Sequence, residues 1–105
     1  MHLQLDCQGK SIVLAPGRSY TLGRSPGCDF VVVSDRVSRR QLEIQHDGSN
    51  WVITDPGSTN GSFVGGVGIR SQVVSGALDL LVGGKNGIEE LEAVPLQGVF
   101  GTLTS

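Results

Sequence analysis

The stretch that decides the fold runs from residue 41 to residue 54 and reads QLEIQHDGSNWVIT. Apolar and polar residues alternate in its two halves, so Leu42 and Ile44 are expected to face a core while their neighbours face water. Between the two halves, residues 47–50 supply the residue types of a tight turn. The stretch therefore predicts a β-hairpin, with Trp51 as a core residue.

The same short-strand pattern continues along the rest of the chain. Sixteen glycines in 105 residues, about twice the usual share, separate stretches rich in valine, isoleucine and leucine, and no segment shows a helical period. Many short strands with turns at close intervals are typical of an all-β sandwich or barrel. The expected strands span residues 2–6, 11–15, 19–23, 29–33, 40–46, 51–54, 62–64, 67–69, 78–82 and 88–94.

Length and composition indicate the broad class of protein. A chain of 105 residues supports one hydrophobic core, and no apolar run approaches the roughly 18 residues needed to cross a bilayer. The first residues lack the positive flank and apolar stretch of a secretion signal, so we expect a soluble cytoplasmic protein. Cys7 and Cys28 form no metal-binding pattern, and we expect neither a metal nor a cofactor.

The charges are unevenly distributed along the chain. The formal net charge is −2, which argues against a general nucleic-acid binder. Half of the eight basic residues nevertheless lie between positions 24 and 40, whereas the C-terminal third is acidic. The basic residues of this segment are Arg24, Arg36, Arg39 and Arg40. This distribution predicts a local anion-binding site on a mildly acidic protein.

Three polar segments interrupt the expected strands, at residues 23–27, 34–41 and 55–62. If the strands of the sandwich run alternately up and down, these segments fall at the same end. They would then form one shallow surface of arginines, hydroxyls and backbone N–H groups. A phosphate monoester is bound by such a set, because a guanidinium donates a forked pair of hydrogen bonds and hydroxyls and amides serve the remaining oxygens.

The same three segments resemble the forkhead-associated (FHA) domain. Gly23-Arg24, the SRRQ run at 38–41 and the DPGSTNGS run at 55–62 are similar to the family pattern G-R, S-x-x-H and D-x-x-S-x-N-G-[TS]. The order and spacing match over residues 20–64. The resemblance implies an FHA-like β-sandwich of about eleven short, mostly antiparallel strands with the binding loops at one end.

The resemblance also implies a role for each matching residue. Arg24 would fork onto the phosphate of a bound phosphothreonine, and Ser38 and Thr59 would add further contacts to it. Arg39 stands where the family often has a basic or amide residue that reaches the same group. Asn60 would bond the main chain of the bound peptide and hold it extended.

Other positions are expected to support the site or to tune it. Arg36 would read the residue three places after the phosphothreonine. Gln41 occupies the position of the family's histidine, which braces the loops rather than touching phosphate, and glutamine can both donate and accept hydrogen bonds there. Gly65 stands where an asparagine is usual. The residues expected to support the site structurally are Gly23, Gln41, Asp55 and Gly61.

The expected function is a phosphothreonine-dependent protein–protein interaction module, without enzymatic activity, whose partner is a phosphorylated protein or peptide. We expect residues 1–94 to form the domain and residues 95–105 a tail or linker, with a monomer as the expected oligomeric state and neither nucleic acid nor membrane as a partner. One alternative is a phosphate-independent interaction or self-association module with the same fold. A small nucleic-acid reader that uses the arginines is a further alternative, although those loops lack aromatic stacking residues.

Overall fold

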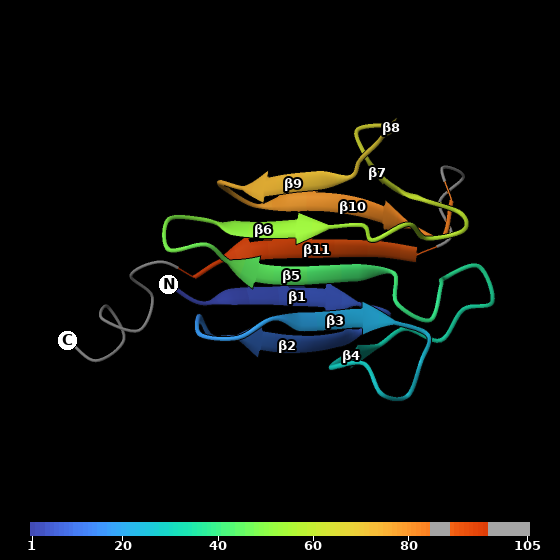
Figure 1. Cartoon of the computed structure of the whole chain (residues 1–105), viewed down its shortest axis with the longest axis horizontal. Coiled ribbons are helices and arrows are strands. Elements are labelled where there is room, and N and C mark those ends of the chain that lie inside the picture. The colour runs from blue at the N-terminus through green and yellow to red at the C-terminus, as the bar shows by residue number, and fades with distance from the viewer. Residues whose placement is uncertain (85–88, 97–105) are drawn as a thin grey trace.

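The computed structural model of the chain describes residues 1–84 and 89–96 and shows two packed β-sheets (Figure 1). The six-stranded sheet has the order β2-β1-β11-β10-β7-β8, and the five-stranded sheet has the order β4-β3-β5-β6-β9. All strand pairs are antiparallel except β3 with β4, which is parallel. The predicted all-β sandwich is therefore confirmed. The strands are β1 (Leu3–Cys7), β2 (Lys10–Leu14), β3 (Tyr20–Gly23), β4 (Phe30–Val31), β5 (Leu42–His46), β6 (Trp51–Thr54), β7 (Ser62–Val64), β8 (Val67–Gly68), β9 (Ser71–Val74), β10 (Leu78–Val82) and β11 (Glu89–Pro95).

The core lies between the two sheets and is built by the predicted alternation. Leu42, Ile44 and Trp51 are completely buried, because the two-residue period turns every second side chain of β5 and β6 inward. The indole N–H of Trp51 donates to the carbonyl of Met1 at 3.2 Å, so the buried polar atom has a partner. The six-stranded sheet contributes its own inward row, including Leu80 on β10.

The hairpin between β5 and β6 forms as predicted. His46 pairs with Trp51 across the two strands, and the backbone N–H of Asp47 donates to the carbonyl of Asn50 at 3.0 Å. The carboxylate of Asp47 also accepts the backbone N–H groups of Ser49 and Asn50, an arrangement typical of aspartate in turns. The turn thus fixes the register that buries the core residues on both sides of it.

One strand was not predicted from the sequence. β9 pairs with β6 at the edge of the five-stranded sheet, and only Val74 of its four residues is buried. An edge strand with one buried side chain carries almost no hydrophobic period, so the pattern was missed there. All ten predicted strands have a counterpart, with boundaries that differ by up to two residues; residue 88 of the last one lies outside the described residues.

β11 is the last strand of the described residues. The strand runs to Pro95, which pairs with Leu3, and the N–H of Leu96 donates to the carbonyl of His2 at 2.9 Å. Of the tail expected at 95–105, residues 97–105 lie outside the described residues. Within the described ranges, no helix is long and apolar enough to span a membrane.

Three loops gather at the end of the sandwich that lies away from the N-terminus (Figure 1). They are the β3–β4 loop (residues 24–29), the β4–β5 loop (residues 32–41) and the β6–β7 loop (residues 55–61). The prediction that the three polar segments share one end is confirmed. The strict up-and-down order from which it was argued is wrong for β4, because the β3–β4 loop doubles back and β4 then runs parallel to β3.

Candidate functional site

Gly23 and Arg24 bring the end of β3 against the β4–β5 loop. The backbone N–H of Arg24 donates to the carbonyl of Ser38 at 3.0 Å. A Cβ atom at Gly23 would lie 2.1 Å from the carbonyl oxygen of Arg39, well inside contact distance, so this close approach requires glycine. The glycine before Arg24 is therefore explained by the packing of two backbones.

The side chain of Arg24 is held at one atom only. Its Nε donates to the carbonyl of Val37 at 3.1 Å, and within the described part of the chain its two terminal Nη groups make no hydrogen bond. The residue is exposed. A guanidinium fixed in this way can present the forked Nη pair to an anion with little further loss of side-chain freedom.

Ser38 and Thr59 connect the β4–β5 loop to the β6–β7 loop. The backbone N–H of Thr59 donates to the hydroxyl oxygen of Ser38 at 2.9 Å. The Ser38 hydroxyl keeps its proton for a further acceptor, and the exposed hydroxyl of Thr59 makes no hydrogen bond to any described residue. Together with the Arg24–Ser38 contact, this bond brings donors from all three loops to one place.

Asn60 ties the β6–β7 loop to the backbone at Arg36. Its Nδ2 donates to the carbonyl of Arg36 at 2.7 Å, while its side-chain oxygen accepts no hydrogen bond from the described residues. The amide is thus oriented by one N–H, and its second N–H and its oxygen are available to a peptide main chain.

A fourth segment, just after β10, takes part in the same surface. The backbone of Gly83 donates to the carbonyl of Gly61 at 3.2 Å and accepts from the Nε of Arg36 at 3.4 Å. Gly83 has a φ of +85°, and a Cβ there would lie 3.1 Å from the carbonyl oxygen of Arg36. Sequence reasoning missed this contribution, although the Gly83-Gly84 pair directly after a strand was a signal for a special backbone position.

Gln41 is completely buried beneath the loops and joins two of them. Its side-chain oxygen accepts the backbone N–H of Ser38 at 2.9 Å. Its Nε2 lies 3.0 Å from the Ser58 hydroxyl oxygen, 2.9 Å from the carbonyl oxygen of Gly61 and 2.9 Å from the Ser62 hydroxyl oxygen, so three acceptors share two N–H groups. The glutamine therefore braces the β4–β5 loop against the β6–β7 loop.

Asp55 organises the β6–β7 loop from its first residue. One carboxylate oxygen accepts the N–H groups of Gly57 and Ser58 at 2.8 and 2.7 Å, and the other accepts the hydroxyls of Ser58 and Ser62 at 2.5 and 2.8 Å. Burial by itself would raise the pKa of this carboxyl, but the hydrogen bonds from Ser58, Gly57 and Ser62 outweigh burial and hold the pKa below its ordinary value. The ionised form is thus part of the loop structure.

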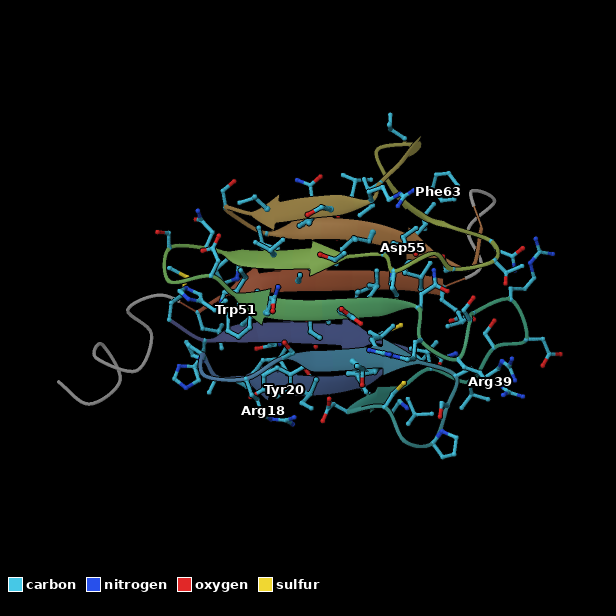
Figure 2. The ribbon with its side chains drawn as sticks, viewed as in Figure 1. Arg18, Tyr20, Arg39, Trp51, Asp55 and Phe63 are labelled. Atoms are coloured by element: carbon cyan, nitrogen blue, oxygen red, sulfur yellow. The ribbon has the colours of Figure 1, made fainter. Side chains whose placement is uncertain are left out.

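The two neighbouring arginines of the β4–β5 loop differ in their partners. Arg40 forms an ion pair with Glu43 at 2.5 Å, so its charge is already matched. Arg39 projects from the loop end (Figure 2) and is exposed, and its side chain makes no hydrogen bond within the described ranges. Its carbonyl oxygen instead accepts the N–H of Ser25 and the thiol of Cys28. Of the two, Arg39 is the one available to an anion.

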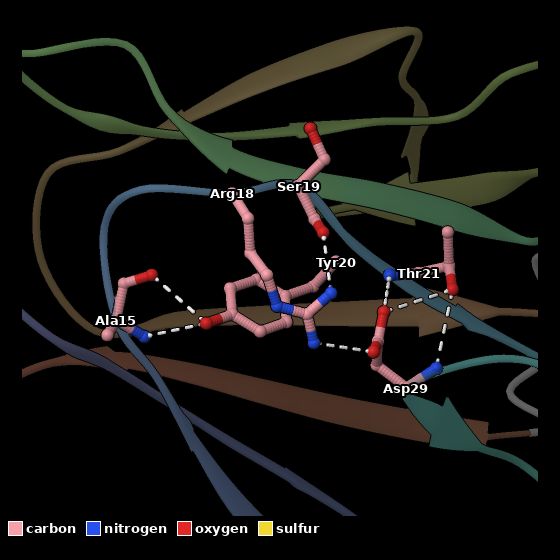
Figure 3. Close-up of polar contacts among 6 residues, drawn as sticks. All are labelled: Ala15, Arg18, Ser19, Tyr20, Thr21 and Asp29. Atoms are coloured by element: carbon pink, nitrogen blue, oxygen red, sulfur yellow. Dashed lines mark hydrogen bonds and ion pairs between the residues drawn. The ribbon is translucent and has the colours of Figure 1, made fainter.

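The β3–β4 loop is fastened where it returns to the sheet (Figure 3). Asp29 accepts the backbone N–H of Thr21 at 2.9 Å and pairs with Arg18 at 2.7 Å, and the Arg18 guanidinium stacks 4.1 Å from the centre of the Tyr20 ring. The hydrogen bond from Arg18 and that from the Thr21 backbone hold the pKa of the Asp29 carboxyl below its ordinary value. This exposed cluster fixes the far end of the loop that begins at Arg24.

The loop end presents Arg24, Arg39 and Thr59 as exposed residues. Hollows of about 230, 370 and 350 Å³ lie elsewhere, over β2 and β4 and on the six-stranded sheet, and none of the three is lined by Arg24, Ser38 or Thr59. Among the described residues, no group of three or more His, Cys, Asp or Glu side chains is placed to hold a metal ion. The loop end therefore suits a ligand bound at the surface by directed hydrogen bonds.

Comparisons of the sequence with known proteins all indicate the same family. The sequence model of the FHA domain matches residues 20–78, more than half of the chain. An FHA domain-containing protein of Arabidopsis thaliana is 33% identical over 58 residues, which are 54% of this chain but 15% of that protein. The chain thus corresponds to a small part of that relative's length.

Solved structures agree with the sequence match. FHA-1 of Mycobacterium tuberculosis Rv1747 superimposes with a TM-score of 0.84 at 25% identity, covering 89% of this chain and 94% of that one. A structure described for phosphothreonine-dependent FHA domain interactions has a TM-score of 0.78 at 26% identity, covering 90% of this chain and 97% of that one. The FhaA FHA domain, complexed with the intracellular domain of Rv3910, has a TM-score of 0.75 at 26% identity, covering 87% of this chain and 98% of that one. This chain belongs to the FHA domain family.

Proposed function

We propose that the three-loop end binds a phosphothreonine-containing segment of a partner protein and that the domain performs no catalysis. The observation that carries the proposal is the contact between the three loops, in which the backbone N–H of Arg24 donates to the carbonyl of Ser38 at 3.0 Å and the backbone N–H of Thr59 donates to the hydroxyl of Ser38 at 2.9 Å. These contacts support a shared surface to which Arg24, Ser38 and Thr59 contribute donors. A phosphate carries close to two negative charges at neutral pH, so hydrogen bonds from these residues to the bound phosphate would be charge-assisted and stronger than neutral ones.

The other loop residues extend the site beyond the phosphate. Arg39 adds a second exposed cation, which favours a dianionic group. Asn60, oriented by its bond to the Arg36 carbonyl, offers an N–H and an oxygen to the main chain on either side of the phosphothreonine. Arg36 lies against Gly83 and is proposed to contact the residue three places after the phosphothreonine, where an acidic side chain would complement it.

Two structural neighbours support the ligand class. One is described by phosphothreonine-dependent interactions, and another, Mycobacterium tuberculosis EmbR, is described in complex with a low-affinity phosphopeptide. The position of Gln41 also supports a working site, because its buried bonds to Ser38 and to the β6–β7 loop hold the loops together without the family's histidine. Weak affinity is expected, since one short extended segment buries little apolar area.

A peptide-library experiment tests the proposal. Degenerate peptides with a central phosphothreonine, phosphoserine or unmodified threonine are screened against the wild type and Arg24→Ala, and the selected sequences are titrated. Loss of the arginine should weaken phosphothreonine binding by about 30- to 150-fold, the equivalent of about 2–3 kcal/mol for hydrogen bonds to a charged group.

The control is Arg70→Ala, which removes the same charge from the connection between β8 and β9, where the Arg70 side chain makes no hydrogen bond to the described residues. Its affinity should stay within a few-fold of wild type. Equal binding of phosphorylated and unmodified peptides would favour a phosphate-independent interaction module, and tight binding of DNA or RNA with steep salt dependence would favour a nucleic-acid reader.

A further inference from the structure

Gln8 occupies an unusual backbone position at the β1–β2 turn. Cys7 pairs with Lys10, so Gln8 and Gly9 form a two-residue turn, with φ values of +54° and +73°. Gln8 is the one residue other than glycine with a positive φ in the described part of the chain. Such a turn is normally built from asparagine or aspartate followed by glycine, and a long side chain disfavours this conformation. The side chain is therefore expected to make contacts that offset the free-energy cost of this backbone conformation.

The side-chain amide of Gln8 pairs with the backbone of Val33 as a neighbouring strand would. The N–H of Val33 donates to the Oε1 of Gln8 at 2.9 Å, and the Nε2 of Gln8 donates to the carbonyl of Val33 at 2.9 Å. The second Nε2 proton is directed to the Oε1 of Glu89, at 3.0 Å. Both donors and one acceptor position of the amide are used, and the six-stranded sheet is linked through them to the chain that leaves β4.

The anchored point is where the β4–β5 loop departs from the sheet. β4 has only two residues, and Val33 is 76% exposed, so burial of its side chain does not hold it in place. The Gln8 amide is the partner of both backbone polar groups of Val33. The residues that follow Val33 in this loop include Arg36 and Ser38. The direction of the chain at Val33 therefore influences the positions of these two residues.

A second side chain of the same hairpin reinforces the anchor. The ammonium group of Lys10 donates to the carbonyl of Val31 at 2.5 Å and lies 5.4 Å from the centre of the Phe30 ring. β2 and β4 are both edge strands, so the two sheets are joined along this edge by side-chain bonds from the β1–β2 hairpin to the carbonyls of Val31 and Val33.

We infer that Gln8 is a positioning residue of the phosphopeptide site, which fixes the departure of the β4–β5 loop so that Ser38 and Arg36 are preset for the ligand. The inference rests on the proposed function. Gln8 itself does not touch the phosphate. Its effect on affinity comes from the fraction of molecules in which the loop is already in the binding position, because the apparent affinity falls with that fraction.

Three variants distinguish the effect of losing the Gln8 amide from the effect of relieving the backbone strain. Gln8→Gly suits the positive φ but removes the amide, whereas Gln8→Glu keeps the size of the side chain but loses both donations and places a second carboxylate beside Glu89. The matched control is Gln45→Ala, since Gln45 is also exposed but lies near the end of β5, where it accepts one hydrogen bond from Ser19.

The first readout is hydrogen exchange of the Val33 backbone amide in the unliganded protein. The exchange should accelerate about two- to tenfold in Gln8→Gly, the range expected for the loss of an exposed hydrogen bond, and less in Gln8→Glu, whose carboxylate still accepts the Val33 N–H. It should not change in Gln45→Ala. The second readout is affinity for the library-selected phosphothreonine peptide, which should fall about three- to tenfold in the two Gln8 variants although Gln8→Gly unfolds at a temperature close to wild type.

The two readouts distinguish the possible failures. Wild-type exchange at Val33 in Gln8→Gly would overturn the anchor, and faster exchange with unchanged peptide affinity would overturn the positioning role. If the wild type itself bound no phosphopeptide, the proposed function would fall, while the exchange of Val33 would still decide whether Gln8 holds the loop.

Discussion

Two aspartates stabilise the loops of this domain in different surroundings. Asp55, at the start of the β6–β7 loop, is 6% exposed and accepts four hydrogen bonds from neutral donors. Asp29, at the end of the β3–β4 loop, is exposed and accepts its hydrogen bonds from Thr21 and from the cation of Arg18. Both carboxyls have a lowered pKa, but for different reasons.

The difference shows how the energy of a polar network depends on burial. Water can replace a lost partner of Asp29, because the Arg18–Asp29 pair is open to solvent and exposed ion pairs contribute little. Water has little access to the network of Asp55 and Gln41, where a lost partner leaves buried polar groups without a hydrogen bond. The loops nearest the proposed ligand are therefore the ones with the larger stabilisation from polar contacts.

The largest effect is expected for Gln41→Ala. The change leaves the N–H of Ser38 and the carbonyl of Gly61 without their buried partner, and we expect a loss of about 2–4 kcal/mol in the free energy of unfolding. Urea denaturation measures this loss. Gln45→Ala is the control and should stay within about 0.5 kcal/mol of wild type; a similarly small effect for Gln41→Ala would contradict the bracing role.

Asp55→Asn is expected to have the next largest effect. One carboxylate oxygen becomes an NH₂ group that cannot accept the hydroxyl or N–H donors of Ser58 and its neighbours, so part of the buried network is unmatched. We expect a loss of about 1–3 kcal/mol, measured by the same denaturation. Phosphopeptide affinity should also fall, because Thr59 lies in the same loop. Wild-type stability in this variant would show that the network can rearrange.

Asp29→Asn should destabilise the domain less than Asp55→Asn. The amide keeps one acceptor for the N–H of Thr21 but loses the ion pair with Arg18, and both side chains are open to water. The affinity for the phosphothreonine peptide should change less than twofold, since the cluster lies at the far end of the β3–β4 loop. A loss of stability equal to that of Asp55→Asn would remove the distinction between the two networks.

The smallest effect is a difference in salt response at low pH. Each carboxyl has a folded-state pKa below its unfolded value, so its stabilisation is complete above about pH 4 and is lost as the pH falls through the folded pKa. At an ionic strength of about 1 M, where the screening length is about 3 Å, the Asp29 contribution should shrink more than that of Asp55. Acid denaturation of Asp29→Asn and Asp55→Asn at low and high salt compares the two, and equal salt sensitivity would contradict their different causes.

The sequence was sufficient for most of the fold because the core strands alternate strongly. The alternation of apolar and polar residues predicts the burial of residues such as Leu42, Ile44 and Trp51. β9 was missed because an edge strand with one buried residue has almost no period, and the parallel return of β4 was missed because two residues carry no information on direction.

The site was predicted through local motifs, which identify residues but not the contacts between distant segments. Gly83 follows β10, outside the three polar segments, and Gln8 lies in the β1–β2 hairpin. Their contributions depend on three-dimensional contacts with Arg36 and Val33. The side-chain amide of a glutamine in a turn has no recognisable sequence signal, so only the structure could indicate its contact with the loop.

Mapping of a phosphothreonine peptide by NMR tests most directly whether the three loops act together. The peptide selected from the library is added in phosphorylated and unmodified forms, and the backbone amide shifts of the domain are followed. We predict that the phosphorylated form shifts the amide signals of Arg24, Ser38 and Thr59 together, whereas the unmodified form leaves them in place. Shifts confined to one loop, or the same shifts with both forms, would contradict this prediction.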